Sequence, residues 1–248
     1  MKRMILSVLC LCLVLSPAFA DPLPLLEEYA QDVVQYAEEG NPDSVSIRYS
    51  YRFPHVDPEA PGGMSIDLFY LDLVDYTESF TIPMNMDSFE ETDSATDVTY
   101  TVTCNSDDWF SVLLKTDRIS DGRNAVHFEG QVFTREEGSA AQTVNLPRLL
   151  GILDRDENDE WLQTRQTEKA NTLIRDLVWE AIDEGEGDVA YFPDLTRDML
   201  SHFFFPEEDF YLNEEEDPVF FIQPGYAAPE SAGLLTFCIP LEEIEDEM

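Results

Sequence analysis

Alternation between apolar and polar residues predicts β-strands in several parts of the chain. Residues 45–53 carry an aliphatic or aromatic side chain at every second position, which is the pattern of a half-buried strand. Towards the C-terminal end, two aromatic-rich runs flank a short acidic turn, and this combination predicts a hairpin. The predicted strands are 45–53, 98–104, 109–116, a run ending near residue 133, 209–212, 218–223 and 234–239.

Apolar residues spaced by three and four positions predict helices elsewhere. In residues 22–39, side chains that include Tyr29 and Val33 recur at this spacing, and a Gly-Asn-Pro run follows, so the pattern favours an amphipathic helix. The clearest helical pattern spans residues 159–184 and is followed directly by a glycine, a common residue after a helix end. A shorter helical piece is predicted over residues 195–202.

Strands joined by hairpin turns, with helices in separate stretches, favour an α+β fold. We expect an antiparallel β-sheet packed with one long helix, about 159–184, and with shorter helices. Residues 45–248 are expected to form a single domain, with an N-terminal half over about 45–140 and a C-terminal half over about 141–244. Residues 21–44 are expected to form an N-terminal helix and a linker.

Residues 1–20 have the pattern of a secretory signal peptide. Lys2 and Arg3 precede an apolar run, and Ala18 and Ala20 supply the small residues of a cleavage site. The apolar run is shorter than a membrane span requires. We therefore expect cleavage after Ala20 and a secreted mature chain, extracellular or periplasmic, without a transmembrane anchor.

Two cysteines, Cys104 and Cys238, belong to the expected mature chain. Both lie in runs of β type, and an exported protein works where disulfides are permitted. A disulfide between Cys104 and Cys238 and a pair of buried free thiols are both compatible with these positions.

The chain is strongly acidic, because 52 Asp and Glu against 14 Lys and Arg give a formal net charge of −38. Hydrophobic residues make up 44% of the sequence, which is enough for a packed core and unlike a disordered acidic chain. The charge excludes nucleic acid as a ligand, since phosphates need neutralisation by Lys and Arg. It favours cationic partners, both basic proteins and divalent cations, and it is also compatible with a purely solubilising role.

Catalytic motifs are absent from the sequence. The three histidines, His55, His127 and His202, are far apart, and there is no HExxH, GxSxG, P-loop or GxGxxG after a strand. We therefore expect a protein without enzymatic activity. A hydrolase that cleaves wall polymers with two carboxylates remains the alternative from another class, and a raised carboxyl pKa in a concave cleft would distinguish it.

A short acidic segment before the long helix is the best candidate for a metal site. Asp154, Asp156, Asn158 and Glu160 present oxygen atoms at alternate positions, as at the start of an EF-hand loop. The glycine that such a loop requires at its sixth position is Asp159 here, so the segment is not an EF-hand. A looser Ca²⁺ site, in an exported structural or Ca²⁺-binding protein, and a solvated loop at the helix start are both compatible with it.

Residues 209–244 resemble a known family. The segment 210–213 matches a strand of the type FyLt, and a loop of the type P-Y-x-x-A-P-Y-x-x-G follows a second strand, as in the family. The segment is similar to the C-terminal signature of the extracytoplasmic domain of RsiV-type anti-sigma factors, which sense lysozyme. The same domain follows the catalytic module of PdaC-type peptidoglycan deacetylases. The matching loop positions are Pro224, Ala228, Pro229 and Gly233.

The resemblance implies a secreted, non-catalytic binding module that recognises a lysozyme-type cell-wall hydrolase or the cell-wall glycan itself. The chain departs from the loop pattern at Gly225 and Glu230, where the family usually has aromatic residues. Tyr226 stands beside the first of these positions, and we expect it to be an aromatic anchor in a loop stiffened by Pro224 and Pro229. The alternative for Tyr226 is packing of the loop onto the sheet.

Overall fold

The computed structural model describes residues 22–36, 45–87, 94–120, 122–136, 138–153, 160–185 and 189–248. The predicted signal peptide, residues 1–20, lies outside these ranges, as does the segment 37–44 of the predicted linker. Within the described ranges, no helix combines the length and the apolar character needed to cross a membrane.

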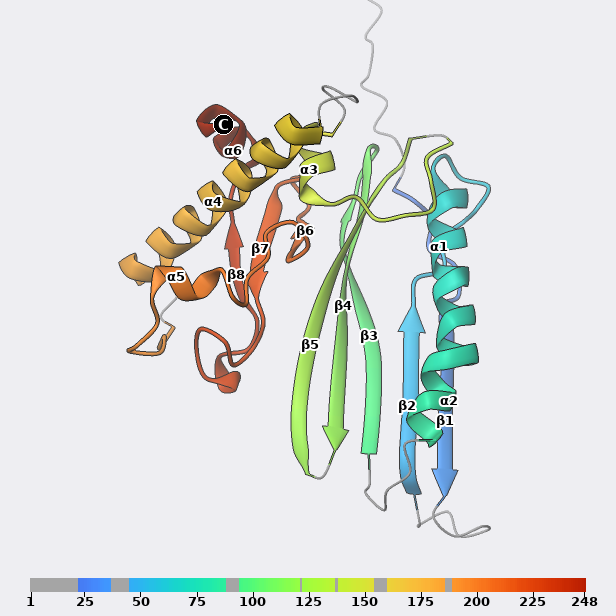
Figure 1. Ribbon diagram of the computed structural model, residues 1–248. Helices are drawn as coiled ribbons and strands as arrows, with labels where there is room; N and C mark the ends of the chain where they lie inside the picture. The colour runs from blue at the N-terminus through green and yellow to red at the C-terminus, as the bar shows by residue number, and fades with distance from the viewer. Residues whose placement is uncertain are drawn as a thin grey trace, which may run out of the picture.

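A five-stranded sheet forms the centre of the molecule (Figure 1). Its strands follow one another in chain order, and each neighbouring pair is antiparallel except β2 and β3, which run parallel. The predicted strands at 98–104 and 109–116 are confirmed and are longer at one or both ends. The five strands are β1 (Tyr29–Tyr36), β2 (Val45–Phe53), β3 (Ser94–Asn105), β4 (Trp109–Ser120) and β5 (Arg123–Thr134).

The parallel pairing of β2 with β3 corrects the expectation of a purely antiparallel sheet. The connection between the two strands contains a helix in three parts, α1 (Gly63–Tyr76), a π-helical turn η1 (Thr77–Thr81) and α2 (Ile82–Asp87). Parallel neighbours need a crossover of this kind, because the chain must return to the end of the sheet from which it came. The apolar run after residue 63 belongs to this crossover helix.

The strand β1 corrects the helix predicted over residues 22–39. Tyr29 pairs with Phe53 of β2 and Val33 pairs with Tyr49, and both Tyr29 and Val33 pack against the core on the helix side of the sheet. Residues four positions apart share a face in a strand as well as in a helix, so their spacing does not separate the two structures. Pairing with β2 decides the outcome, because it satisfies the backbone of this segment while the same side chains pack, partly buried, against the core.

A second, three-stranded sheet and the long helix form the C-terminal half (Figure 1). The strands are antiparallel and match the predicted hairpin and closing strand: β6 (Phe210–Leu212), β7 (Pro218–Ile222) and β8 (Leu235–Cys238). The long predicted helix is confirmed as α4. The helical elements of this half are α3 (Leu146–Leu149), α4 (Glu160–Glu184), α5 (Arg197–Leu200), η3 (Glu230–Ala232) and α6 (Leu241–Glu247). The α+β fold class is therefore correct.

The two faces of the five-stranded sheet belong to different hydrophobic cores. Phe133 on β5 packs in the core that contains Ile66 and Tyr70 of α1. Val132, the preceding residue, packs in the core that contains α4 and the three-stranded sheet. Successive side chains of a strand point to opposite faces, so β5 contributes to both cores. The crossover helix and the three-stranded sheet therefore cover opposite faces of the central sheet.

The three-stranded sheet approaches the central sheet closely at Gly130 of β5. A Cβ atom at this position would overlap the carbonyl oxygen of Phe210, the first residue of β6. Nearby, the fully buried hydroxyl of Ser111 on β4 accepts a hydrogen bond from the backbone N–H of Leu212 over 3.0 Å. The missing side chain of Gly130 and the hydroxyl of Ser111 thus allow backbone to pack directly on a sheet face.

Replacing Gly130 is expected to separate the two sheets. Gly130→Ala should lower the free energy of unfolding by about 3 kcal/mol, because the obstructing atom is backbone and cannot rotate away. Gly138→Ala is the control: its φ is +81° but nothing lies near its added Cβ, so about 1 kcal/mol of backbone strain is expected. Urea unfolding measures both, and equal losses in the two variants would contradict the close approach.

Candidate functional site

The loop between β7 and β8, residues 223–234, has a defined shape set by small residues. Gly225 and Gly233 have φ angles of 84° and 75°, which an L-residue with a side chain rarely adopts. Between them, Ala227 and Ala228 are buried in the C-terminal core, and the carbonyl of Ala227 accepts a hydrogen bond from the N–H of Phe192. The loop is therefore anchored at its middle and turned at both ends.

Gln223 ties the start of this loop to the central sheet. Its Nε2 donates to the carbonyl oxygen of Phe128 on β5 over 2.6 Å, and its Oε1 accepts from the N–H of Phe128 over 2.9 Å. The side-chain amide thus pairs with both backbone groups of one residue, as a neighbouring strand would. Because Gln223 is almost fully buried, losing either bond would leave a polar group without water.

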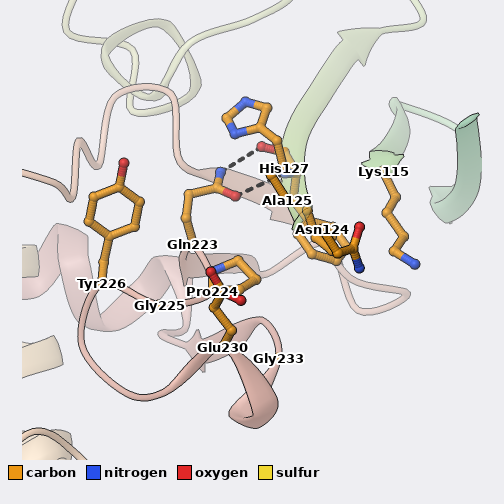
Figure 2. Close-up of a pocket in the computed structure, with 12 residues that line it drawn as sticks. Lys115, Asn124, Ala125, His127, Gln223, Pro224, Gly225, Tyr226, Glu230 and Gly233 are labelled. Atoms are coloured by element: carbon orange, nitrogen blue, oxygen red, sulfur yellow. Dashed lines mark hydrogen bonds between the residues drawn. The ribbon is translucent and has the colours of Figure 1, made fainter. Parts of the chain in front are cut away.

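A pocket of about 760 Å³ lies between the loop and the strands β4 and β5 (Figure 2). The loop and the strands contribute polar and apolar groups from opposite sides, with the two Gln223–Phe128 hydrogen bonds between them. The chemically notable lining residues are Lys115, Asn124 and His127 from the strands, and Gln223, Pro224, Tyr226 and Glu230 from the loop.

Tyr226 is the exposed aromatic residue of this pocket. Its side chain is 55% exposed, and its ring stacks on Phe203 with centroids 5.5 Å apart and an interplanar angle of 26°. Ala227 and Ala228, which follow it, are buried in the core, whereas more than half of Tyr226 remains exposed. Pro224 lines the same pocket, whereas Pro229 is exposed and precedes η3 without lining it.

Charges of both signs border the pocket. Lys115 forms an ion pair with Asp117 over 2.7 Å on the strand side. Glu230 lies on the loop side, where its Cγ is 3.0 Å from the position that a Cβ of Gly225 would occupy. The glutamate stem thus covers the bare backbone of Gly225. Sequence patterns pointed to the loop that contains Pro224, Tyr226 and Glu230, but they gave no signal for Lys115, Asn124 or Gln223, which the fold brings to the same place.

Asp209, a carboxyl group with a raised pKa, is not among the residues that line this pocket. Burial raises the pKa of Asp209 from 3.8 to about 6, and the neighbouring Glu208 adds to the rise, while a hydrogen bond from the N–H of Phe205 opposes it. That hydrogen bond is 2.6 Å long and holds the turn before β6. Among the described residues that line the pocket, Glu230 is the single carboxylate. A paired-carboxylate arrangement is therefore not found in the pocket.

Cys104 and Cys238 are free thiols, so the disulfide considered from the sequence is not formed. Cys104 is buried in the C-terminal core, whereas Cys238 is exposed on β8, where its sulfur accepts a weak hydrogen bond from Asn213. Burial raises the pKa of the Cys104 thiol, and partial desolvation together with the nearby Asp217 and Glu215 raises the pKa of the Cys238 thiol, so both stay protonated. Both cysteines do lie in strands as predicted, but one points into the interior and the other to the surface.

The candidate metal site falls on residues that the structure does not describe. Asp154, Asp156 and Asn158 lie outside the described ranges, and Glu160 is the first residue of α4. Among the described residues, no group of three or more His, Cys, Asp or Glu side chains is placed to hold a metal ion. The three histidines also remain separate, with His127 alone at the loop pocket.

No known family profile and no curated protein matches the sequence. Solved structures do match. A member of the DUF3298 family from Bacteroides fragilis has a TM-score of 0.57 at 10% identity, covering 91% of this chain and 94% of that one. A DUF3298 family protein from Pseudomonas aeruginosa has a TM-score of 0.54 at 14% identity, covering 90% and 93%. The chain has the fold of DUF3298 proteins. At such identities the likeness concerns the fold alone.

Removing the side-chain amide of Gln223 is expected to loosen the loop. Gln223→Met keeps the length of the side chain but leaves both backbone groups of Phe128 unpaired, so a loss of about 1–3 kcal/mol is expected. Gln31→Met on β1, where the side chain is exposed, serves as the control and should change stability by less than about 0.5 kcal/mol. Urea unfolding measures both variants, and an unchanged Gln223→Met would show that the amide does not hold the loop.

Asp209→Asn is expected to stabilise the protein at neutral pH. The folded-state pKa of about 6 exceeds the ordinary 3.8, so the ionised carboxylate of Asp209 destabilises the folded protein above pH 6. Asparagine carries no charge and still accepts the hydrogen bond from the N–H of Phe205. The gain, on the order of 1–2 kcal/mol at pH 7.5, should shrink as pH falls from 6 to 4 and Asp209 takes up its proton. Unfolding curves across this range, with the exposed Asp72→Asn as control, would contradict the account if the gain did not depend on pH.

Proposed function

We propose that this protein is a secreted, non-catalytic binding module that recognises a lysozyme-type cell-wall hydrolase through the loop 224–233. The observation that carries the proposal is Tyr226, whose ring is exposed beside the pocket yet held by Phe203. An aromatic side chain that is ordered before contact loses little conformational freedom on binding, which is why such residues often dominate interfaces. The loop is also the segment on which the resemblance to the lysozyme-sensing regulators rests.

The charge of the chain supports a basic partner. Lysozymes are typically basic proteins, and a net charge of −38 accelerates their approach through long-range attraction. Such steering weakens as salt rises, because screening at physiological ionic strength acts over about 8 Å. Contacts of Tyr226 within the pocket are short-ranged and do not depend on screening in this way. The two contributions can therefore be separated by experiment.

The composition of the pocket supports binding without catalysis. Hydrolysis of a glycosidic bond ordinarily uses two carboxyl groups about 5–10 Å apart. Glu230 is the single carboxylate among the described lining residues, and Asp209, with its raised pKa, is not one of them. Cell-wall glycan is the alternative ligand for the same surface, because sugar rings stack on exposed aromatic faces and the pocket offers polar groups for their hydroxyls.

Binding to a basic lysozyme should depend on Tyr226. Calorimetry at low and near-physiological salt is expected to show one-to-one binding at both, with Tyr226→Ala weakening it by roughly 10- to 100-fold. Tyr36→Ala is the matched control, since Tyr36 is an exposed tyrosine at the end of β1. Its affinity should equal that of the wild-type chain.

Two other results would contradict the proposal. Binding that vanishes at near-physiological salt and is equal in both variants would mean that attraction by net charge alone causes the binding. Binding of soluble wall glycan that requires Tyr226, with none to lysozyme, would assign the same surface to the glycan. Turnover of that glycan, lost in Glu230→Gln, would overturn the non-catalytic role.

A further inference from the structure

The crossover helix carries exposed hydrophobic side chains from its first turn to its last, with exposed carboxylates among them. Of the fourteen exposed large hydrophobic residues in the described ranges, six lie on the segment from α1 to α2, with exposed fractions between 39% and 68%. Large exposed apolar patches on soluble proteins commonly mark sites of interaction with another molecule. The six residues, here called the outer face, are Met64, Leu68, Leu71, Tyr76, Phe80 and Met84.

These six side chains are not needed to attach the helix to the sheet. The opposite face of the helix already buries Ile66 and Tyr70 in the core, and the hydroxyl of Tyr70 donates a hydrogen bond to the buried Gln131 on β5. The π-helical turn η1 lies between the two ends of the outer face, and the rings of Tyr76 and Phe80 stack there with centroids 5.5 Å apart. Short π-helical turns within helices are frequently found at functional sites.

A second pocket of about 420 Å³ opens at the start of this face. It lies between α1, the preceding loop and the segment around Gly138, and both Met64 and Leu68 line it. Two carboxylates, those of Glu59 and Glu136, lie on the same lining. An apolar side chain inserted here would contact Met64 and Leu68 while a neighbouring cation met the carboxylates. The pocket thus offers an anchor point at one end of the outer face.

The charged residues on the segment that carries the outer face are all of one sign. The segment from Gly63 to Asp87 contains five Asp and Glu and neither Lys, Arg nor His. Asp72 and Asp75 are exposed next to Leu71 and Tyr76. A second copy of the chain would bring the same carboxylates and a net charge of −38, and an anionic membrane surface would also be repelled. Only a positively charged partner gains from both features of this face.

We propose that the outer face of α1, η1 and α2 docks a cationic amphipathic helix of a partner protein. The apolar side of that helix lies on the six hydrophobic residues, and its Lys or Arg side chains meet Asp72, Asp75 and the carboxylates of the second pocket. This surface is separate from the loop pocket, because α1 and the three-stranded sheet cover opposite faces of the central sheet (Figure 1). The inference therefore does not rest on the proposed function.

The test uses a fluorescently labelled synthetic peptide of Leu and Lys, about five helical turns long, with all Leu on one face. Its binding to the full chain, followed by fluorescence anisotropy, should be saturable and at least tenfold tighter than that of a peptide with the same composition in scrambled order. Leu68→Gln with Phe80→Gln should weaken binding at least tenfold. Ile119→Gln with Met199→Gln, which changes two exposed hydrophobic residues elsewhere, should leave binding unchanged.

A second variant tests the charged part of the surface. Asp72→Asn with Asp75→Asn should weaken binding of the amphipathic peptide and reduce its dependence on salt. Equal binding of the ordered and scrambled peptides, or equal affinities in the two hydrophobic double variants, would overturn the proposal, because net charge would then explain the result. Sedimentation of the chain alone that shows a dimer, lost in Leu68→Gln with Phe80→Gln, would also overturn it by identifying a second copy as the occupant.

Discussion

The contact between β5 and the three-stranded sheet determines where the loop 223–234 can lie. Gly130 allows the carbonyl of Phe210 to pack on the sheet face, Ser111 accepts the N–H of Leu212, and Gln223 pairs with both backbone groups of Phe128. The first two bring the backbone of the three-stranded sheet directly against the central sheet, and the third joins the two through a buried side-chain amide. The polar groups that this close contact buries have hydrogen-bond partners, so the contact carries no large desolvation cost. The pocket exists because the loop starts from that junction.

Local sequence patterns predicted the elements of the C-terminal half well and their assembly poorly. The long helix, the hairpin of β6 and β7 and the loop with Pro224 and Tyr226 each have a signal within a few neighbouring residues. The strand β1 was mistaken for a helix, because spacing by four residues fits both structures and only pairing with β2 distinguishes them. The parallel pairing of β2 and β3 depends on a crossover that no local pattern specifies.

The residues that complete the site have the same long-range origin. Lys115, His127 and Gln223 are ordinary polar residues in the sequence, and they meet at one pocket only after two sheets have packed together. The cysteines illustrate the opposite case. Both occur in strands, as their patterns suggested, but the direction of each side chain depends on its sheet face, so Cys104 is buried and Cys238 is exposed. Pairing of such residues cannot be inferred from strand patterns alone.

We propose that the loop held against β5 is a binding surface for a basic protein. Hydrogen–deuterium exchange of the chain, with and without saturating lysozyme, tests it directly because the readout is local and does not depend on net charge. If the loop is the contact surface, exchange in residues 223–233 and 124–128 should be slower when lysozyme is bound. Exchange that is unchanged in both segments, with protection confined to other parts of the chain, would contradict it.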